Sequence, residues 1–330
     1  MSPKTLRIFS TTAIARTCLA GTLGLPLLAA VQACAAPSGG APTAQSAVAP
    51  TSPGPAPATS VTSKSPRATA TRPSPTSSSP ASGTAGHQDP FGSAARAYVN
   101  GRSGTVTAAV YDVSTGQTWT LGSSKPQAEA SVVKLNILEA LYAQHGRDGL
   151  SASDTSLTRQ MMEDSDNDAA TDLWEEAGGP SRIASFNTAA GLTDTEPSSC
   201  VQCPDFPWPG WGLSTTTPTD QLALLRELVK PGGLLTGSQR DAALELMENV
   251  APSQRWGVSG GVPAAATVAL KDGWLPLNDS NTDWQINSVG WVSGSGRDYL
   301  MAVLTTGNPT EQYGIDTINE LAAQVWQRLG

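Results

Sequence analysis

A serine and a lysine three residues apart open a strongly apolar run of this chain. Ser131 and Lys134 lie in the run Ala-Ser-Val-Val-Lys-Leu-Asn, residues 130–136. Residues three apart share one face of a helix, so the serine hydroxyl and the lysine amine can lie within hydrogen-bond reach. A lysine that is desolvated, or close to a second cation, loses its proton more easily and can then accept the serine's proton. Ser-x-x-Lys arises by chance roughly once in a chain of this length, so catalysis needs support from other residues.

Two later patterns supply that support. Ser165-Asp166-Asn167 follows an apolar pair of methionines, and Lys271-Asp272-Gly273-Trp274 closes a predicted strand. The chain here resembles the class A β-lactamases and penicillin-binding serine transferases, and in particular β-lactamase-like lipoproteins of the actinobacterial type. Their signature is Ser-x-x-Lys, Ser-Asp-Asn and Lys-Thr-Gly in this order. The first two patterns match letter for letter, and the resemblance runs from about Gly104 to the C-terminus. It includes Gly-Gly-Pro at 178–180 and Thr-Thr-Thr-Pro at 215–218.

The resemblance implies a role for each matching residue. Ser131 would be the nucleophile, Lys134 its base, and Ser165 the relay that passes a proton to the leaving nitrogen. The substrate-binding residues would be Asn167, Lys271, Asp272, Gly273 and Trp274. Asn167 would hold the substrate amide, and Lys271 would attract a substrate carboxylate. The amide groups of Ser131 and Trp274 would stabilise the developing oxyanion.

Two departures from the family pattern predict an unusual enzyme. Asp272 replaces a hydroxyl residue, and at about 4 Å with an effective dielectric of about 20 its charge would cost a substrate carboxylate about 4 kcal/mol. The family's Glu-x-x-Leu-Asn, which activates the deacylating water, is missing from residues 191–214. The acids in that stretch are Asp194, Glu196 and Asp205. We therefore expect acylation with slow release of the acyl group.

Strand patterns lie at both ends of the folded part and helical patterns lie between them. The predicted strands are 105–112, 117–121, 267–271, 284–292 and 298–305, with helices at 91–100, from Ser131 onward, and up to Leu329. Such a chain can pair its ends in one sheet and insert a helical lobe. We predict an α/β (α+β) two-lobed domain over 89–330. It has an antiparallel sheet of about five strands, flanking terminal helices and a helical lobe at about 131–263. The cleft between the lobes would hold the site.

The first 88 residues have a different composition. Lys4, Arg7 and Arg16 precede a short apolar stretch, which is typical of a secretory signal peptide over 1–33. Val-Gln-Ala-Cys then resembles a bacterial lipobox, so Cys34 would receive a lipid that anchors the protein in the membrane. Residues 34–88 are mostly Ala, Pro, Ser, Thr and Gly and indicate a disordered linker. The protein would lie outside the cytoplasm on the cell membrane, or be secreted if Cys34 is an ordinary residue beside an Ala-x-Ala cleavage site.

Charge and metal-ligand patterns exclude several other functions. All 28 acidic residues follow Gln88, with 14 basic residues, so this part carries a formal charge of −14. Affinity for nucleic acid comes from neutralised phosphates, so we expect no nucleic-acid partner. No cofactor is implied. Calcium-loop spacing occurs over 164–175, but Ala169 stands where the sharp turn needs glycine, so no metal site is predicted.

Cys200 and Cys203 form Cys-x-x-Cys without the βαβ setting of a redox motif or enough ligands for zinc. A local disulfide is expected. The surrounding residues (Phe206, Trp208, Trp211) would pack this loop onto the helical lobe or form an aromatic wall of the cleft. His145, near the end of the helix that follows Ser131, would only cap that helix.

The sequence therefore predicts an exported serine hydrolase, a monomer, acylated at Ser131 by a β-lactam or a peptide amide derived from peptidoglycan. The alternative is a degenerate relative that binds a cell-wall ligand or a partner.

Overall fold

The computed structural model describes residues 88–146 and 149–330. The predicted signal peptide, Cys34 and all of the predicted linker except Gln88 lie outside these residues. The α-helices are Ser93–Asn100 (α1), Val133–His145 (α2), Ala152–Glu163 (α3), Asn167–Glu176 (α4), Gly179–Ala190 (α5), Pro218–Val229 (α6), Gly237–Glu248 (α7) and Glu311–Arg328 (α8). The strands are Thr105–Asp112 (β1), Thr118–Leu121 (β2), Gln127–Ala128 (β3), Thr215–Thr216 (β4), Thr267–Pro276 (β5), Trp284–Gly294 (β6) and Arg297–Asn308 (β7). Short 3₁₀ turns relevant below are Ala130–Val132 (η1), Gly210–Leu213 (η3) and Gly257–Ser259 (η5).

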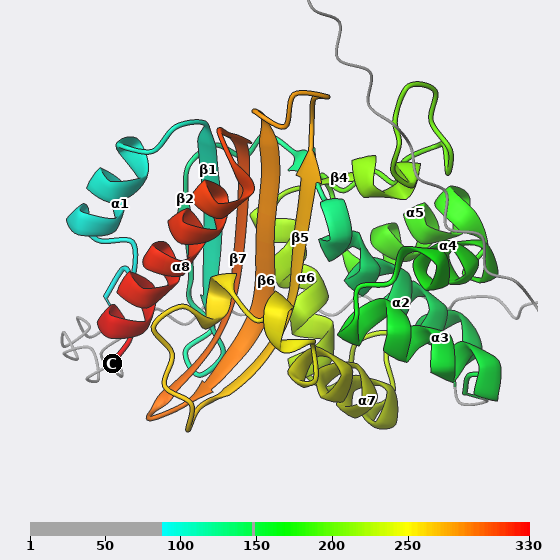
Figure 1. Ribbon diagram of the computed structural model, residues 1–330. Coiled ribbons are helices and arrows are strands. Elements are labelled where there is room, and N and C mark those ends of the chain that lie inside the picture. The colour runs from blue at the N-terminus through cyan, green and yellow to red at the C-terminus, as the bar shows by residue number, and fades with distance from the viewer. Residues whose placement is uncertain (1–87, 147–148) are drawn as a thin grey trace, which may run out of the picture. The chain divides into compact units, whose positions relative to one another are not determined.

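Five strands form one antiparallel sheet in the order β2-β1-β7-β6-β5, and β3 pairs with β4 in a separate two-stranded sheet. The N-terminal strand β1 lies beside the C-terminal strand β7, so the two ends of the domain are joined in the sheet (Figure 1). The strand β5 forms the edge nearest to the helices α2–α5 (Figure 1). This arrangement confirms the predicted fold class, with helices inserted between the two groups of strands.

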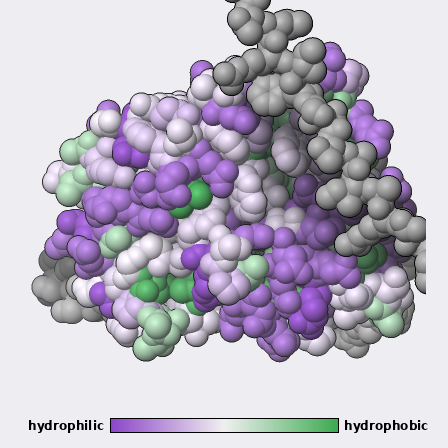
Figure 2. Space-filling model, in the orientation of Figure 1, coloured by the Kyte–Doolittle hydropathy of each residue, from purple (hydrophilic) through white to green (hydrophobic). Residues whose placement is uncertain are grey.

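Both faces of the sheet are covered. One hydrophobic cluster joins α8 to residues such as Leu270, Val292 and Met301, while the other joins the helical lobe to residues such as Ala269, Val289 and Leu300. Adjacent residues of one strand belong to different clusters because side chains alternate across a sheet. The central helix α2 is buried almost all round, as its apolar sequence predicted. Hydrophilic residues gather over the outer sides of α8 and α7 (Figure 2).

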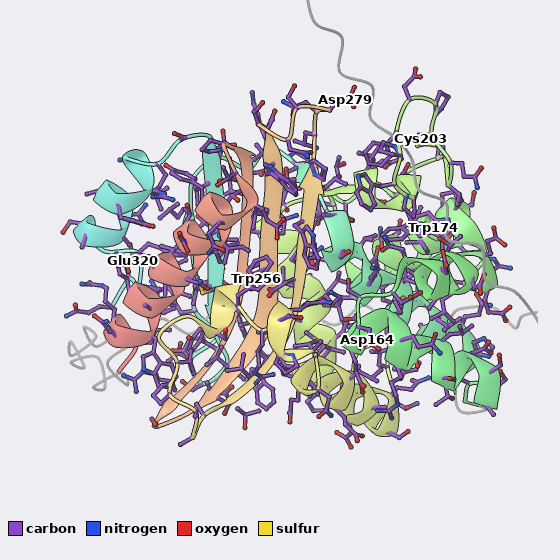
Figure 3. The ribbon with its side chains drawn as sticks, viewed as in Figure 1. Asp164, Trp174, Cys203, Trp256, Asp279 and Glu320 are labelled. Atoms are coloured by element: carbon purple, nitrogen blue, oxygen red, sulfur yellow. A yellow bond between two sulfur atoms is a disulfide. The ribbon has the colours of Figure 1, made fainter. Side chains whose placement is uncertain are left out.

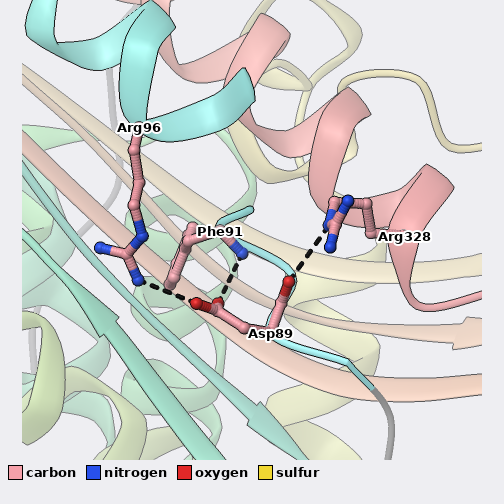
Figure 4. Close-up of polar contacts among 4 residues, drawn as sticks. All are labelled: Asp89, Phe91, Arg96 and Arg328. Atoms are coloured by element: carbon pink, nitrogen blue, oxygen red, sulfur yellow. Dashed lines mark hydrogen bonds and ion pairs between the residues drawn. The ribbon is translucent and has the colours of Figure 1, made fainter. Parts of the chain in front are cut away.

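The first described residues form hydrogen bonds with each other and with the C-terminal helix α8. Asp89 accepts hydrogen bonds from the Phe91 amide (2.8 Å) and from Arg96 (2.9 Å), and its carbonyl accepts one from Arg328 (3.1 Å; Figure 4). The Phe91 side chain is fully buried. These bonds and the buried Phe91 ring attach the segment around Asp89 to the rest of the fold.

Most elements lie close to their predicted bounds, with two differences that affect the site. The predicted strand 267–271 continues to Pro276, since it pairs with β6 along its whole length. Ser131 lies in the 3₁₀ turn η1, and the α-helix begins only at Val133. No helix within 88–146 or 149–330 is long and apolar enough to cross a bilayer.

Candidate active site

Ser131 lies where the turn η1 passes the edge strand β5. A Cβ atom on Gly273 would lie 2.7 Å from the Ser131 nitrogen and 2.8 Å from that of Val132, closer than real contacts allow. Glycine at 273 therefore lets the strand approach the backbone of the serine turn. The close approach brings the β5 backbone beside the start of α2.

The segment before Ser131 is also held from the sheet. The buried Asn287 on β6 donates hydrogen bonds to the carbonyls of Ala128 (2.9 Å) and Glu129 (2.8 Å). Ala130 has a φ of +50°, a left-handed conformation that is uncommon outside glycine and costs of order 1–2 kcal/mol. Such strain persists only where the surroundings determine the backbone, as the Asn287 bonds do here.

Ser165 lies in the tight connection between α3 and α4. Asp166 is the N-cap of α4, and its side chain accepts from the Ala169 amide at 2.8 Å. Ser165 itself has a φ of +56°. Because Asp166 caps α4, Asn167 is the first residue of this helix. The side chains of Ser165 and Asn167 both lie within hydrogen-bond distance of the Lys134 amine. Residues 167–175 of the calcium-loop spacing are part of the helix α4.

The Lys134 amine lies between Ser131 and the Ser165–Asn167 segment. Its Nζ lies 3.2 Å from Ser131 Oγ, 3.0 Å from Ser165 Oγ, 2.6 Å from the Ser165 carbonyl and 2.8 Å from Asn167 Oδ1. The lysine side chain is completely buried. Burial, and then the nearby charge of Lys271, lower the pKa of Lys134 well below its usual 10.5, against a smaller opposing effect of Asp166.

A second buried lysine completes the polar cluster. Lys271 Nζ lies 3.0 Å from Ser165 Oγ and donates to the Asp272 carbonyl at 2.9 Å. Its own burial lowers the pKa of Lys271 to about 8, while Asp272 acts in the opposite direction. The Ser165 hydroxyl is thus placed between two amines that both lose protons more easily than a lysine in water.

Asp272 does not lie where the resemblance placed it. Its side chain points to the α8 face of the sheet, beside Ser288, and its Oδ2 accepts from the Trp256 amide at 3.2 Å. The reason is strand alternation: Lys271 and Gly273 face the serine turn, so the residue between them faces away. Burial raises the pKa of Asp272 to about 8. The substrate-binding role predicted for Asp272, and the repulsion expected from it, are wrong.

A cleft of about 330 Å³ opens onto these groups. Its walls are mostly aromatic or aliphatic. The lining residues are Ala130, Ser131, Ser165, Asn167, Trp208, Pro209, Trp211, Gly212, Trp274, Leu275, Pro276 and Trp284. Its volume lies within the range of about 300–1,000 Å³ that is typical of small-molecule sites. Ser131, Ser165, Asn167 and Trp274 thus share one cleft, whereas Asp272 is outside it.

The loop that follows α5 brings no acid to the cleft. Glu196 is exposed and pairs with Thr215 through its backbone, and none of the three acids of residues 191–214 lines the cleft. Instead Trp211 on η3 is buried, donates its indole N–H to Thr171 (3.0 Å), and lies with its ring centre 5.0 Å from Lys134 Nζ. An indole ring therefore lies beside the lysine that would serve as the base.

The Cys200–Cys203 disulfide is present and closes the tip of the same loop (Figure 3). Both predicted uses of the aromatic loop occur, because Trp211 packs against the helical lobe while Trp208 and Trp211 also line the cleft. His145 lies at the C-terminal end of α2, with Nε2 3.8 Å from a Glu176 carboxylate oxygen, far along the helix from Ser131.

A profile of the "Beta-lactamase enzyme family" matches residues 146–329, more than half of the chain. The chain belongs to this family. The matched region holds the second and third sequence patterns, and Ser131 and Lys134 precede it. The chain is also 31% identical over 209 residues to the protein named putative lipoprotein LppW of Mycobacterium tuberculosis and Mycobacterium bovis. That match covers 60% of the chain and 62% of these relatives.

Solved structures of the β-lactamase family share the fold. The TLA-1 extended-spectrum β-lactamase superposes with a TM-score of 0.63 at 17% identity, covering 73% of this chain and 98% of the enzyme. The structure of PBP-A superposes with a TM-score of 0.58 at 20% identity, covering 70% of this chain and 92% of that chain. At such identities these likenesses concern the fold alone.

Sequence reasoning missed part of this β-lactamase-family cleft. Leu275, Pro276 and Trp284 line it, and none was singled out. The available signal was the apolar run that continues directly from Trp274, followed by turn residues at 278–281 and then Trp284. That pattern predicts a hairpin whose two arms, β5 and β6, extend past Lys271.

Proposed function

We propose that this chain is an exported serine acyl-transfer enzyme of the β-lactamase and penicillin-binding type, with Ser131 as the nucleophile. Its donor would be a β-lactam or a peptide amide derived from the cell wall. The observation that carries the proposal is the position of the buried Lys134 amine among Ser131, Ser165 and Asn167.

Burial and the nearby charge of Lys271 favour a neutral Lys134 amine, and the hydrogen bonds around it leave that amine able to accept a proton. The Ser165 carbonyl and Asn167 Oδ1 only accept, so they use two N–H groups of the amine. A neutral amine then has its lone pair free to accept the Ser131 proton. Ser131 Oγ would attack the donor carbonyl carbon, forming a C–O bond as the C–N bond breaks. The proton would pass from Lys134 through Ser165 to the leaving nitrogen, and amide groups of Ser131 and Trp274 would hold the oxyanion.

The cleft favours a long-lived acyl-enzyme. No carboxylate lines it among the described residues, so no carboxylate base is in place to activate water. Trp211 occupies space beside Lys134 with an apolar ring. Hydrolysis of the ester should therefore be slow unless an acceptor amine takes the acyl group.

The chain's location is part of the proposal. The predicted signal peptide and Cys34, together with relatives whose name includes "lipoprotein", support export and lipid attachment at the outer face of the membrane. Residues 34–88, which are mostly Ala, Pro, Ser, Thr and Gly, would then serve as a tether.

Intact mass spectrometry after incubation with penicillin G and with an acyl-peptide thioester tests the function. We expect an adduct on wild-type protein, with a lifetime of minutes or longer, and none on Ser131→Ala. The Ser114→Ala variant, on the β1–β2 turn, is the matched control and should be labelled normally. Absence of any Ser131-dependent adduct would favour the alternative, a relative that binds a cell-wall ligand or partner without chemistry.

A further inference from the structure

The Cys200–Cys203 disulfide lies against the backbone of Gly210. A Cβ atom on this glycine would be 2.3 Å from the Cys203 sulfur and 2.4 Å from the Cys200 carbonyl oxygen, closer than real contacts allow. Glycine at 210 therefore lets the two sides of the loop touch, and its amide donates a hydrogen bond to the Val201 carbonyl. Both cysteines are half-buried, so a small reductant can reach the disulfide from solvent.

The residues that follow Gly210 form a wall of the cleft beside the reacting groups. Trp211 and Gly212 both line the cleft. Trp211 is buried, and its ring centre lies 5.0 Å from Lys134 Nζ. A Cβ atom on Gly212 would lie 3.9 Å from the Ala130 Cα, an ordinary contact distance to the serine turn. The disulfide thus supports, through one glycine, the segment that packs beside the proposed base and nucleophile.

The base of the loop has separate attachments. The Ser214 hydroxyl accepts from the Ser198 amide (3.0 Å) and donates to the Trp211 carbonyl (2.7 Å), and the Trp211 indole donates to Thr171 (3.0 Å). These bonds do not involve sulfur, so the loop should stay attached when the disulfide is broken. Stabilisation by a crosslink grows with the length of the loop that it closes, so a bond between residues three apart contributes little to global stability. Its effect should be on the local shape of the wall.

From these contacts we infer that the disulfide is a positioning element, which holds Trp211 beside Lys134 and thereby keeps water away from acylated Ser131. This inference rests on the proposed function. With the wall in place, the indole ring occupies the space beside the amine where a hydrolytic water would be activated. When the disulfide is broken, the wall can move and admit water, and Lys134 can deprotonate that water for attack on the ester.

The reductant for the test is a water-soluble phosphine, because a thiol could itself cleave the acyl ester. The phosphine gives two electrons to the disulfide and becomes a phosphine oxide with the oxygen of one water molecule, whose two protons convert the sulfurs to thiols. In hydrolysis, the oxygen of another water molecule bonds to the acyl carbon as the ester bond to Ser131 Oγ breaks. Lys134 takes a proton from that water and delivers it to the serine oxygen.

The test follows the penicillin G adduct by intact mass after the free drug is removed. Reduced protein and the Cys200→Ser/Cys203→Ser variant should lose the adduct about tenfold faster than oxidised protein. A general base contributes about 10²–10⁴-fold, and the wall need be open only part of the time. Acylation should change less than about threefold, because the loop makes none of the Lys134 hydrogen bonds. Ser199→Ala, exposed in the same loop, is the control and should behave as wild type.

Gly210→Ala separates the contact from the bond. Its methyl group would lie 2.3 Å from the Cys203 sulfur, so the wall and the disulfide must move apart while the disulfide stays intact. Adduct loss should again be faster, with little further change on reduction. In wild type, removing the phosphine and reoxidising with oxidised glutathione should restore the long lifetime, a result that a misfolded protein cannot give. The phosphine should have no effect on the Cys200→Ser/Cys203→Ser variant.

The outcomes distinguish the inference from the function. Adduct lifetimes that are equal in oxidised and reduced protein, or longer after reduction, would overturn the inference while acylation of Ser131 stands. A loss of acylation in parallel with a lower melting temperature, without faster adduct loss, would give the disulfide a purely structural role and also overturn it. If oxidised wild-type protein forms no Ser131-dependent adduct with penicillin G or with the acyl-peptide thioester, the proposed function is wrong, and this inference with it.

Discussion

The two faces of β5 carry different kinds of residues although they alternate within one short stretch of sequence. Lys271 and Gly273 face the serine turn, where the lysine amine reaches Ser165 and the glycine leaves room for the Ser131 backbone. Leu270 and Asp272 face α8, where they are buried with the second hydrophobic cluster or bonded to the Trp256 amide. Neighbouring positions of a sequence motif on a strand can therefore lie on opposite sides of a sheet. Substitutions on the two faces should have different consequences.

The largest effect is expected at Lys271, on the site face. Lys271→Met removes a buried positive charge beside the Ser165 hydroxyl, so acylation should slow about 10²-fold, as for other lost electrostatic stabilisers. The rate of adduct formation with the acyl-peptide thioester measures this. Lys230→Met is the control, because Lys230 contacts Tyr111 away from the cleft and its loss should leave the rate unchanged. A decrease of less than threefold for Lys271→Met would show that the charge of Lys271 does not assist acylation.

Gly273→Ala should have the next largest effect. Its new methyl group would lie 2.7 Å from the Ser131 nitrogen, so the serine turn and β5 must separate. Overpacking of this kind costs about 1–3 kcal/mol, which corresponds to about 5- to 160-fold in rate if the shift falls on the reacting geometry. Adduct formation and thermal unfolding are measured together. Gly237→Ala on α7, where the nearest atom would be 3.7 Å away, should change neither.

The pH dependence tests whether the two buried lysines act in opposite protonation states. Acylation needs neutral Lys134, so the rate should rise as pH increases through its lowered pKa. Lys271 assists as a cation, and its pKa of about 8 means that the rate should fall above pH 8. The decrease should be about tenfold between pH 7 and pH 9 if neutral Lys271 is inactive. In Lys271→Arg the charge persists, so the alkaline decrease should disappear. An unchanged alkaline limb in this variant would assign it to another group.

The same comparison shows how much of this molecule could be predicted from its sequence. The hydrophobic patterns predicted the five-stranded sheet and the buried helix α2. The spacing of apolar residues along a strand or a helix follows directly from which of its sides are buried. The groups around Lys134 were predicted one by one from motifs. Their distances were not, since they depend on the left-handed backbone at Ala130 and Ser165 and on the closeness allowed by Gly273. Asp272 was misplaced because the motif was compared letter by letter, although strand alternation was already sufficient to place it opposite Lys271.

Asp272→Asn should have the smallest effect on chemistry, and it discriminates between the two placements of this residue. If the carboxylate faced the cleft, its removal would relieve about 4 kcal/mol of repulsion on an anionic donor, a gain of about 10³-fold in acylation. In the structure the carboxyl lies across the sheet, and burial raises its pKa to about 8, so that it is largely protonated at pH 7. Asparagine has nearly the same shape as the protonated acid. We therefore expect acylation by penicillin G and by the acyl-peptide thioester to change less than about threefold, with the ratio of the two rates unaltered, because the substitution is on the α8 face. A large gain confined to penicillin G, which carries a carboxylate, would place the Asp272 charge in the cleft after all, and would show that this residue repels anionic donors there.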